Sequence, residues 1–126
     1  MNNWGIKLLI LFLLMSSALV FAQQTPLKIN TTSKTINYED GIAKFYICNL
    51  NQAVSFKEEL EYTWYNEFSL INSSKGGAGG NLLHGKRQFF DLRGNLINET
   101  NYYLGLKDGD EKIWDEKGTL KTIHKY

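Results

Sequence analysis

The chain has 126 residues, with 14 lysines and arginines against 13 aspartates and glutamates. This length allows one modest domain, and the nearly balanced charge argues against nucleic acid as a partner, because nucleic acid calls for a basic surface. The same balance argues against strong electrostatic binding to an anionic membrane.

Residues 1–22 predict a cleaved secretory signal peptide. Residues 8–20 are apolar apart from two serines, and Val20-Phe21-Ala22 supplies small residues at positions −3 and −1 of a signal-peptidase site. The apolar run is about 15 residues long, whereas a membrane-spanning helix needs roughly 20. We therefore expect cleavage near Ala22 and an exported protein, periplasmic, on the outer surface or secreted, rather than an uncleaved anchor. Cleavage leaves 126 − 22 = 104 residues with 13 basic and 13 acidic side chains.

Residues 23–37 are polar, contain the only proline and show no hydrophobic period, which predicts a flexible leader. The folded domain is expected over 38–126. It begins with the run IAKFYICNL, which predicts a strand with a turn at Asp40-Gly41 before it. Cys48 in this run is the only cysteine, so no intrachain disulfide can form. We expect Cys48 to be a buried, small apolar side chain, with a reactive thiol as the alternative.

The next segment, SFKEELEYTWYNEF, carries two conflicting signals. Ser55 and Glu58 have the spacing of a helix capping box. The residues that follow alternate polar and apolar side chains, which is the two-residue period of a strand. We expect a strand over 59–66, with a single helical turn at 55–59 as the alternative. No segment keeps a helical apolar stripe for three turns, so the sequence predicts an all-β protein.

The last part of the chain repeats itself. A fixed short period is the signature of a repeat architecture. When the sequence is shifted by 24, residues 82–102 and 106–126 are identical at six of 21 positions: Leu82/Leu106, Gly85/Gly109, Asp91/Asp115, Gly94/Gly118, Leu96/Leu120 and Tyr102/Tyr126. A weaker match at a shift of 25 extends the pattern towards the N-terminus, which predicts repeats at roughly 59–83, 84–107 and 108–126.

Each repeat predicts one β-hairpin. Asp91-Leu-Arg-Gly94 and Asp115-Glu-Lys-Gly118 fit type I turns, because Asp accepts backbone hydrogen bonds at the first position and Gly adopts the left-handed conformation. Successive hairpins then form a single-layer array, joined by glycine turns such as residues 103–109. The residues that we expect to shape these turns are Gly85, Asp91, Gly94, Gly105, Gly109, Asp115 and Gly118.

Strand alternation is expected to line up large side chains on one face. Pairing Phe90 with Leu96 places both on the face of Tyr102, and the next repeat adds Trp114, Leu120 and Tyr126 to the same face. This row is either a binding surface or the only core of a thin sheet. The candidate binding residues are the aromatic ones: Trp64, Phe90, Tyr102, Trp114 and Tyr126.

The strand at residues 119–126 ends in mid-repeat, so a row of backbone donors and acceptors is expected to lack a partner. We expect it to dock onto a second copy or onto an unknown partner protein by strand addition.

The repeat resembles the MORN-repeat variants of bacterial exported proteins, including the YwqK-family antitoxin-like modules. GLKDGDEKIW and KGTL carry the resemblance most closely, and LLHGKRQFF with RGNL carries it less tightly. It covers roughly residues 59–126 and departs from the family pattern at Asp110-Glu111-Lys112. The resemblance implies a single-layer hairpin array and a role in protein interaction. It also suggests, as one alternative, an antitoxin-like or immunity-like inhibitor of a secreted effector.

The remaining candidates for chemistry have simpler explanations. GGAGGNLLH, at 76–84, is close to a calcium-binding β-roll repeat but occurs once, which favours a flexible glycine turn. The acids in 108–116 lack EF-hand spacing and are interleaved with lysines, as on a solvated surface. His84 and His124, the only two histidines, have no partner at metal-ligand spacing in the sequence.

The sequence contains no recognisable nucleophile motif or triad. We therefore expect a protein without cofactor, metal or enzymatic activity, whose function is protein interaction. A glycan-binding protein that stacks sugars on its tryptophans is a further alternative.

Overall fold

The computed structural model describes residues 26–126, so the predicted signal peptide and residues 23–25 lie outside the described part of the chain. Within this part the protein is all-β, with two antiparallel sheets. None of the described residues form a helix long and apolar enough to cross a membrane.

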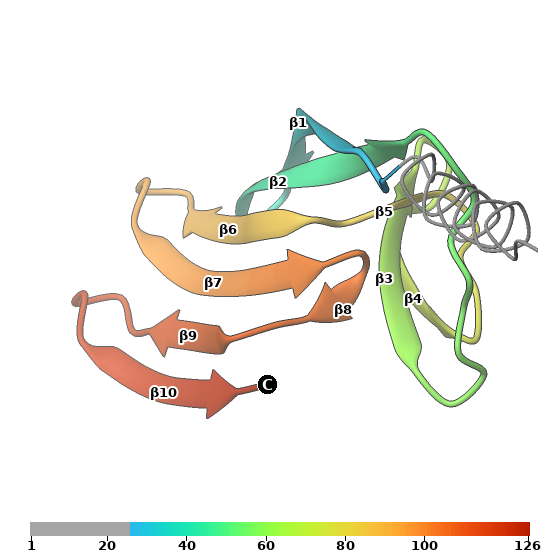
Figure 1. Cartoon of the computed structure of the whole chain (residues 1–126). Helices are drawn as coiled ribbons and strands as arrows, with labels where there is room; N and C mark the ends of the chain where they lie inside the picture. Colours follow the sequence, from blue (N-terminus) through green and yellow to red (C-terminus); the bar gives the residue numbers. More distant parts are fainter. Residues whose placement is uncertain (1–25) are drawn as a thin grey trace, which may run out of the picture.

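The larger sheet has seven strands in the order β1-β2-β6-β7-β9-β10, with β8 paired to the end of β7 (Figure 1). The smaller sheet has the order β4-β3-β5 and stands across one end of the larger sheet in Figure 1. The strands are β1 (Ile29–Tyr38), β2 (Gly41–Leu50), β3 (Glu61–Asn66), β4 (Leu70–Lys75), β5 (Asn81–Leu82), β6 (Gly85–Asp91), β7 (Leu96–Tyr103), β8 (Leu106–Lys107), β9 (Asp110–Trp114) and β10 (Leu120–Lys125).

The prediction of a flexible leader was wrong for residues 29–37, because they form β1. This strand pairs with β2 over ten residues, from Ile29 opposite Leu50 to Tyr38 opposite Gly41. Only Ile36 of β1 is buried. An edge strand is held mainly by backbone hydrogen bonds to its neighbour, so it needs few apolar side chains and leaves no hydrophobic period in the sequence.

β2 and β3 match the sequence expectations more closely. Side chains of β2 alternate between buried and exposed from Gly41 to Ile47, and the turn before the strand lies at Glu39-Asp40. β3 covers most of the predicted strand at 59–66 and begins at Glu61. A turn precedes it, in which the Leu60 N–H donates to the Lys57 carbonyl at 3.2 Å.

The two turns of the repeat are confirmed and have the same hydrogen bonds. The Oδ1 atom of Asp91 accepts the N–H groups of Arg93 and Asn95, both at 2.9 Å. In the second turn Oδ1 of Asp115 accepts those of Lys117 and Thr119, again at 2.9 Å. The predicted turn glycines all have positive φ: Gly85 95°, Gly94 82°, Gly105 82°, Gly109 73° and Gly118 82°.

The predicted single layer was wrong for the first repeat, residues 59–83. Its hairpin, β3–β4, forms the smaller sheet with β5 instead of continuing the array of β6–β7 and β9–β10. The glycine turn before β5 lies closely against β3, since a Cβ at Gly80 would be 2.1 Å from the Tyr65 carbonyl oxygen. Because glycine permits this approach, the chain passes over the hairpin and β5 pairs with β3 rather than with β4.

The two sheets are joined by backbone hydrogen bonds at one tight turn. Tyr103 pairs with Leu106, so Leu104 and Gly105 are the two central residues, with φ values of 45° and 82°. Positive φ at both positions defines a type I′ hairpin turn. The Gly105 N–H donates to the Leu83 carbonyl and the Gly105 carbonyl accepts the Thr63 N–H, both at 2.7 Å. We call this turn the junction turn.

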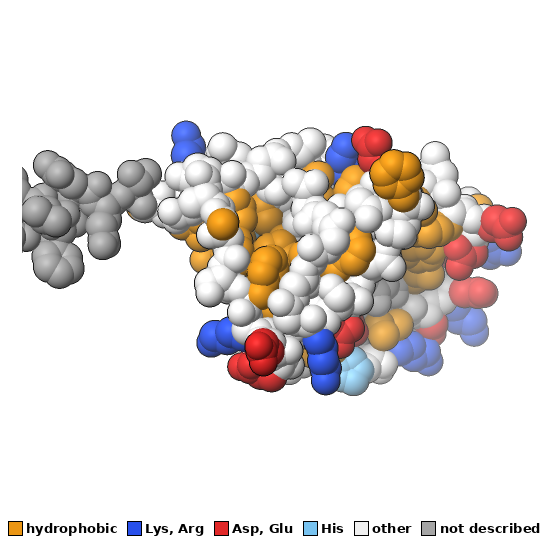
Figure 2. All heavy atoms as spheres, turned by 90° about the vertical axis from the view of Figure 1, so that its right-hand side faces the viewer, with side chains coloured by type: hydrophobic (Ala, Val, Ile, Leu, Met, Phe, Trp, Pro, Cys, Tyr) orange, Lys and Arg blue, Asp and Glu red, His pale blue; other side chains and the backbone are white. Residues whose placement is uncertain are grey.

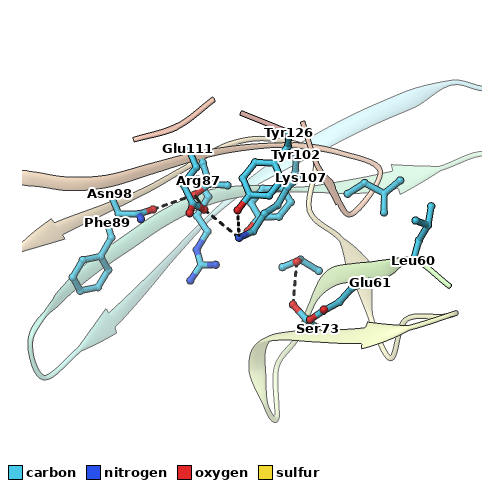
Figure 3. A pocket seen from close by; sticks show the side chains of 13 residues that line it. Leu60, Glu61, Ser73, Arg87, Phe89, Asn98, Tyr102, Lys107, Glu111 and Tyr126 are labelled. Carbon is cyan, nitrogen blue, oxygen red and sulfur yellow. Dashed lines mark hydrogen bonds and ion pairs between the residues drawn. The ribbon is translucent and has the colours of Figure 1, made fainter. Parts of the chain in front are cut away.

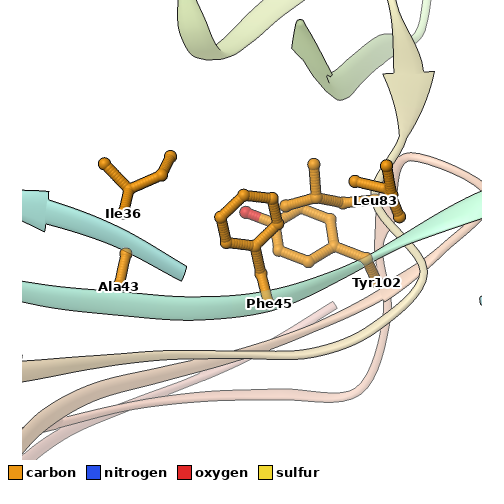
Figure 4. Packing of buried hydrophobic residues seen from close by; sticks show 6 residues of the cluster. Ile36, Ala43, Phe45, Leu83 and Tyr102 are labelled. Atoms are coloured by element: carbon orange, nitrogen blue, oxygen red, sulfur yellow. The ribbon is translucent and has the colours of Figure 1, made fainter. Parts of the chain in front are cut away.

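Most of the core lies between the sheets on the side of β1 and β2. Phe45 and Leu83 are each 1 % exposed, and Ile36, Ala43 and Tyr102 pack with them (Figure 4). Partly buried side chains of the smaller sheet, including Tyr65 and Ile71, close this cluster from the other side. Burying one such large apolar side chain contributes about 1.5–3 kcal/mol to folding. The face of the larger sheet that bears Phe45 is called the inner face below, and the opposite face is the outer face.

Candidate binding sites

The predicted aromatic row is divided between the two faces of the larger sheet. Phe89 pairs with Asn98 but Phe90 pairs with Leu96, so Ile97 is an extra residue in β7. A β-bulge of this kind reverses the alternation of side chains along its strand. Leu96 therefore lies with Phe90 on the outer face, and the prediction that Tyr102 shares this face was wrong.

The second repeat has the same bulge. Trp114 pairs with Leu120 as predicted, but Ile113 pairs with Thr122, so Lys121 is the extra residue. Asn98 of the inner face pairs with Ile113, which places Trp114 on the outer face together with Phe90. Tyr126, which lies beyond the bulge, is on the inner face.

Trp64 does not belong to the row. It lies in β3 of the smaller sheet, where its indole N–H donates to the Ser74 hydroxyl at 2.8 Å and its ring packs on the cluster around Cys48. The structure therefore brings together Phe90 with Trp114 on one face and Tyr102 with Tyr126 on the other, while Trp64 stands apart from both pairs.

A cleft of about 840 Å³ separates the inner face from the smaller sheet (Figure 3). Its floor comes from β6, β7, β8 and β9, and its opposite wall comes from β3 and β4. Tyr126 closes it beyond the end of β10. The residues that line it are Leu60, Glu61, Thr63, Ser73, Arg87, Phe89, Asn98, Thr100, Tyr102, Leu106, Lys107, Glu111 and Tyr126.

The floor of the cleft is ordered in rows that run across the strands. Arg87 of β6 pairs with Thr100 of β7, and the Thr100 hydroxyl donates to Glu111 of β9 at 2.9 Å. Phe89 and Asn98 form the neighbouring row on one side. The strand spacing of about 4.8 Å places Arg87 and Glu111 roughly 10 Å apart, with Thr100 between them.

Glu111 is neutralised within the cleft. Lys107 lies 3.2 Å from its carboxylate and also approaches the Tyr126 hydroxyl at 3.4 Å. Partial burial favours the neutral form of Glu111, but hydrogen bonds from Thr100 and Lys107 outweigh it and lower the pKa of Glu111. The pKa of Lys107 is raised for the converse reason, since Glu111 and Tyr126 offset the effect of its own burial.

Arg87 has no comparable partner. It is partly buried on the cleft floor, and no carboxylate in residues 26–126 lies within 4.0 Å of its guanidinium. In Figure 3 the guanidinium extends away from the sheet into the cleft, with no interaction drawn to it. The lining of the cleft thus carries one compensated cation, Lys107, and one uncompensated cation, Arg87.

The predicted edge strand, β10, lies at one end of the larger sheet and is mostly exposed. Tyr126, just after β10, and Gly109, just before β9, exchange backbone hydrogen bonds of 2.9 and 3.3 Å that continue the β9–β10 pairing. Because backbone groups alternate in direction along an antiparallel strand, Lys125 and Ile123 point their N–H groups away from β9. No described strand covers that side of β10.

Cys48 and His84, two other side chains with potential chemistry, form structural hydrogen bonds. The Cys48 thiol is buried and donates to the Leu82 carbonyl at 3.1 Å, and burial raises the pKa of this thiol. The His84 Nδ1 atom accepts the Leu104 N–H at 3.1 Å and so supports the junction turn. His124 is exposed on β10. Residues 26–126 contain no group of three or more potential metal ligands.

The face formed by the smaller sheet has few charged side chains in its middle. Figure 2 shows apolar side chains in its middle, whereas lysines, arginines and acids lie mostly at the margins. Phe68, in the β3–β4 turn, is 98 % exposed.

Comparison with protein-family models, curated proteins and solved structures finds no match.

Sequence reasoning that followed the largest rings named Tyr102 and Tyr126 of the cleft but missed its other residues, including Arg87. A signal was nevertheless present, because the two-residue period places Arg87 on the same side of its strand as Phe89. The two-residue period does not predict the opposite wall of the cleft, because that wall is formed by the β3–β4 hairpin, which does not continue the array.

Proposed function

We propose that the protein is an exported, non-enzymatic interaction module that binds a partner protein by adding a strand of that partner to β10. The open edge of β10 is the observation that carries this proposal. Ile123 and Lys125 direct their backbone N–H groups outward, and side-chain exposure along β10 leaves room for an approaching strand. The resemblance of the hairpins to MORN-repeat variants supports an interaction role, and residues 1–22 support export.

The charge of β10 indicates what kind of strand it would accept. Lys121, His124 and Lys125 are its only titratable side chains, and β10 contains no acid. If two copies paired in antiparallel fashion about Ile123, Lys121 of one copy would face Lys125 of the other, which is unfavourable. Lys121 already lies 3.5 Å from Asp115, so a partner strand with aspartate or glutamate opposite Lys125 fits better than a second copy.

A proline at the outward position tests the proposal. Ile123→Pro removes one outward N–H without touching a bond to β9, and proline is tolerated at such edge positions. Ile123→Val keeps the N–H and the β-branched shape, so it is the matched control. Each variant of the mature protein is immobilised and exposed to the native envelope fraction, and retained proteins are identified by mass spectrometry.

We expect the wild type and Ile123→Val to retain the same partner and Ile123→Pro to lose it, with binding then reproduced by the purified partner. Thermal unfolding of the variants checks that each is folded. Retention of the same proteins by all three variants would contradict docking at β10. If the wild type retained no protein above background, the result would contradict the interaction role itself.

A further inference from the structure

The cleft between the sheets offers a second, independent site. Its volume of about 840 Å³ lies within the range of about 300–1,000 Å³ that is typical of small-molecule sites. Five aromatic or aliphatic side chains line it together with eight polar or charged ones, which come from both walls (Figure 3). Apolar surface with convergent polar groups in one cleft can hold and orient a ligand, which a flat docking surface cannot.

The polar groups that remain available in the cleft are mainly donors. The Arg87 guanidinium presents N–H groups that no described carboxylate occupies. The Thr100 hydroxyl lies 3.1 Å from the Asn98 side-chain oxygen, but its single hydrogen is donated to Glu111, so the Asn98 amide offers the cleft both donor and acceptor groups. On the opposite wall Thr63 and Ser73 share one hydroxyl hydrogen bond of 3.1 Å, so one hydroxyl hydrogen of the pair is left over.

The acids of the cleft do not satisfy these donors. Glu111 is held by Thr100 at 2.9 Å and by Lys107 at 3.2 Å, and Glu61 is exposed at the rim. A ligand for this site must therefore bring its own negative charge. Lys107 is paired with Glu111, so Arg87 is the cation of the cleft that has no carboxylate within 4.0 Å, and one such cation suits a monoanion better than a phosphate dianion.

We propose that the cleft binds a small organic acid, with its carboxylate on the Arg87 guanidinium and its apolar body against Phe89 and Tyr102. The guanidinium fork matches a carboxylate in a bidentate arrangement. Phe89 lies next to Arg87 on the inner side of β6, and Tyr102, which is 5 % exposed, lines the cleft beside them.

The test uses the mature protein labelled with ¹⁵N and titrated with phenylacetate and with hexanoate. Phenylacetamide, hexanamide and inorganic phosphate are titrated in parallel. We expect saturable amide shifts at Arg87, Thr100 and Tyr102 with the two carboxylates. The neutral amides, which have nearly the same shape, are expected to bind about tenfold more weakly or worse, because they lack the charge that pairs with the guanidinium.

Two arginine variants make the test specific. Arg87→Gln is expected to weaken both carboxylates by about tenfold or more. Arg93→Gln, the same change at an exposed turn residue outside the cleft, is expected to leave binding unchanged. If Arg87→Gln fails to fold, the affinities of the wild type for the carboxylates and for the neutral amides still test the proposal. The proposal is overturned if neither carboxylate gives saturable shifts, if the amides or phosphate bind as well, or if folded Arg87→Gln binds like the wild type.

Discussion

The two ends of the larger sheet use glycines of identical conformation for different purposes. Gly94, Gly105 and Gly118 all have φ of 82°. One end of the sheet, which we call the free end, holds the turns at Asp91 and Asp115. There a Cβ added to Gly94 or Gly118 would meet nothing within 4 Å. At the other end, a Cβ on Gly105 would lie 2.7 Å from a methyl group of Leu82 and 3.2 Å from the Thr63 carbonyl oxygen. A turn signal in a sequence therefore gives the backbone conformation, but its energetic weight depends on what packs against it.

The comparison predicts that alanine substitutions at these glycines differ sharply in cost. Gly105→Ala combines left-handed strain with overpacking at the junction turn, and we expect it to lower the free energy of unfolding by about 2–4 kcal/mol. Gly118→Ala suffers the strain alone, and we expect about 1 kcal/mol. Urea denaturation of both variants measures the difference. Equal losses would mean that the junction turn does not hold the sheets together.

Substitutions of the two histidines compare the junction turn with an exposed strand in the same way. His84→Ala removes the acceptor of the Leu104 N–H and the ring that lies 5.1 Å from the Tyr103 ring, so we expect a loss of about 1–2 kcal/mol. His124→Ala changes an exposed residue of β10, where about 0.5 kcal/mol or less is expected. The hydrogen-exchange rate of the Leu104 amide provides a local measurement, and we expect it to rise in His84→Ala only.

The aspartates in the turns of the free end should make the stability of the protein depend on pH in the acid range. Hydrogen bonds from the backbone N–H groups of Asn95 and Thr119 are the main causes that lower the pKa of Asp91 and of Asp115, respectively. A carboxyl whose pKa is lowered by folding adds stability that is fully present above its unfolded pKa of about 3.9. That stability is lost as the pH falls through the lower pKa of the folded state.

The double variant Asp91→Asn/Asp115→Asn should therefore be less stable than the wild type at neutral pH but lose less stability below about pH 4. Urea midpoints measured over this pH range provide the test. Parallel curves for the two proteins would show that these turns do not contribute to acid sensitivity.

Local chemistry made the turns predictable from the sequence. Asp followed three residues later by Gly specifies its own hydrogen bonds, so the hairpins at Asp91 and Asp115 required no knowledge of the rest of the chain. The pairings of Phe90 with Leu96 and of Trp114 with Leu120 followed from those turns and are confirmed.

Features that depend on distant neighbours could not be read in the same way. The bulges at Ile97 and Lys121 shift each row by one residue and leave no distinct signal in the sequence. β1 is defined by its pairing with β2 rather than by its own side chains. For the candidate sites, the open edge of β10 was predictable from the repeat, whereas the cleft was not, since its wall comes from β3–β4.

The openness of β10 is tested most directly by hydrogen exchange of individual amides in the free mature protein. We expect the N–H groups of Ile123 and Lys125, which point outward, to exchange rapidly, whereas that of His124 between them is protected by its hydrogen bond to β9. Protection of Ile123 and Lys125 equal to that of His124 would mean that this edge is already covered, and would contradict docking of a partner strand there.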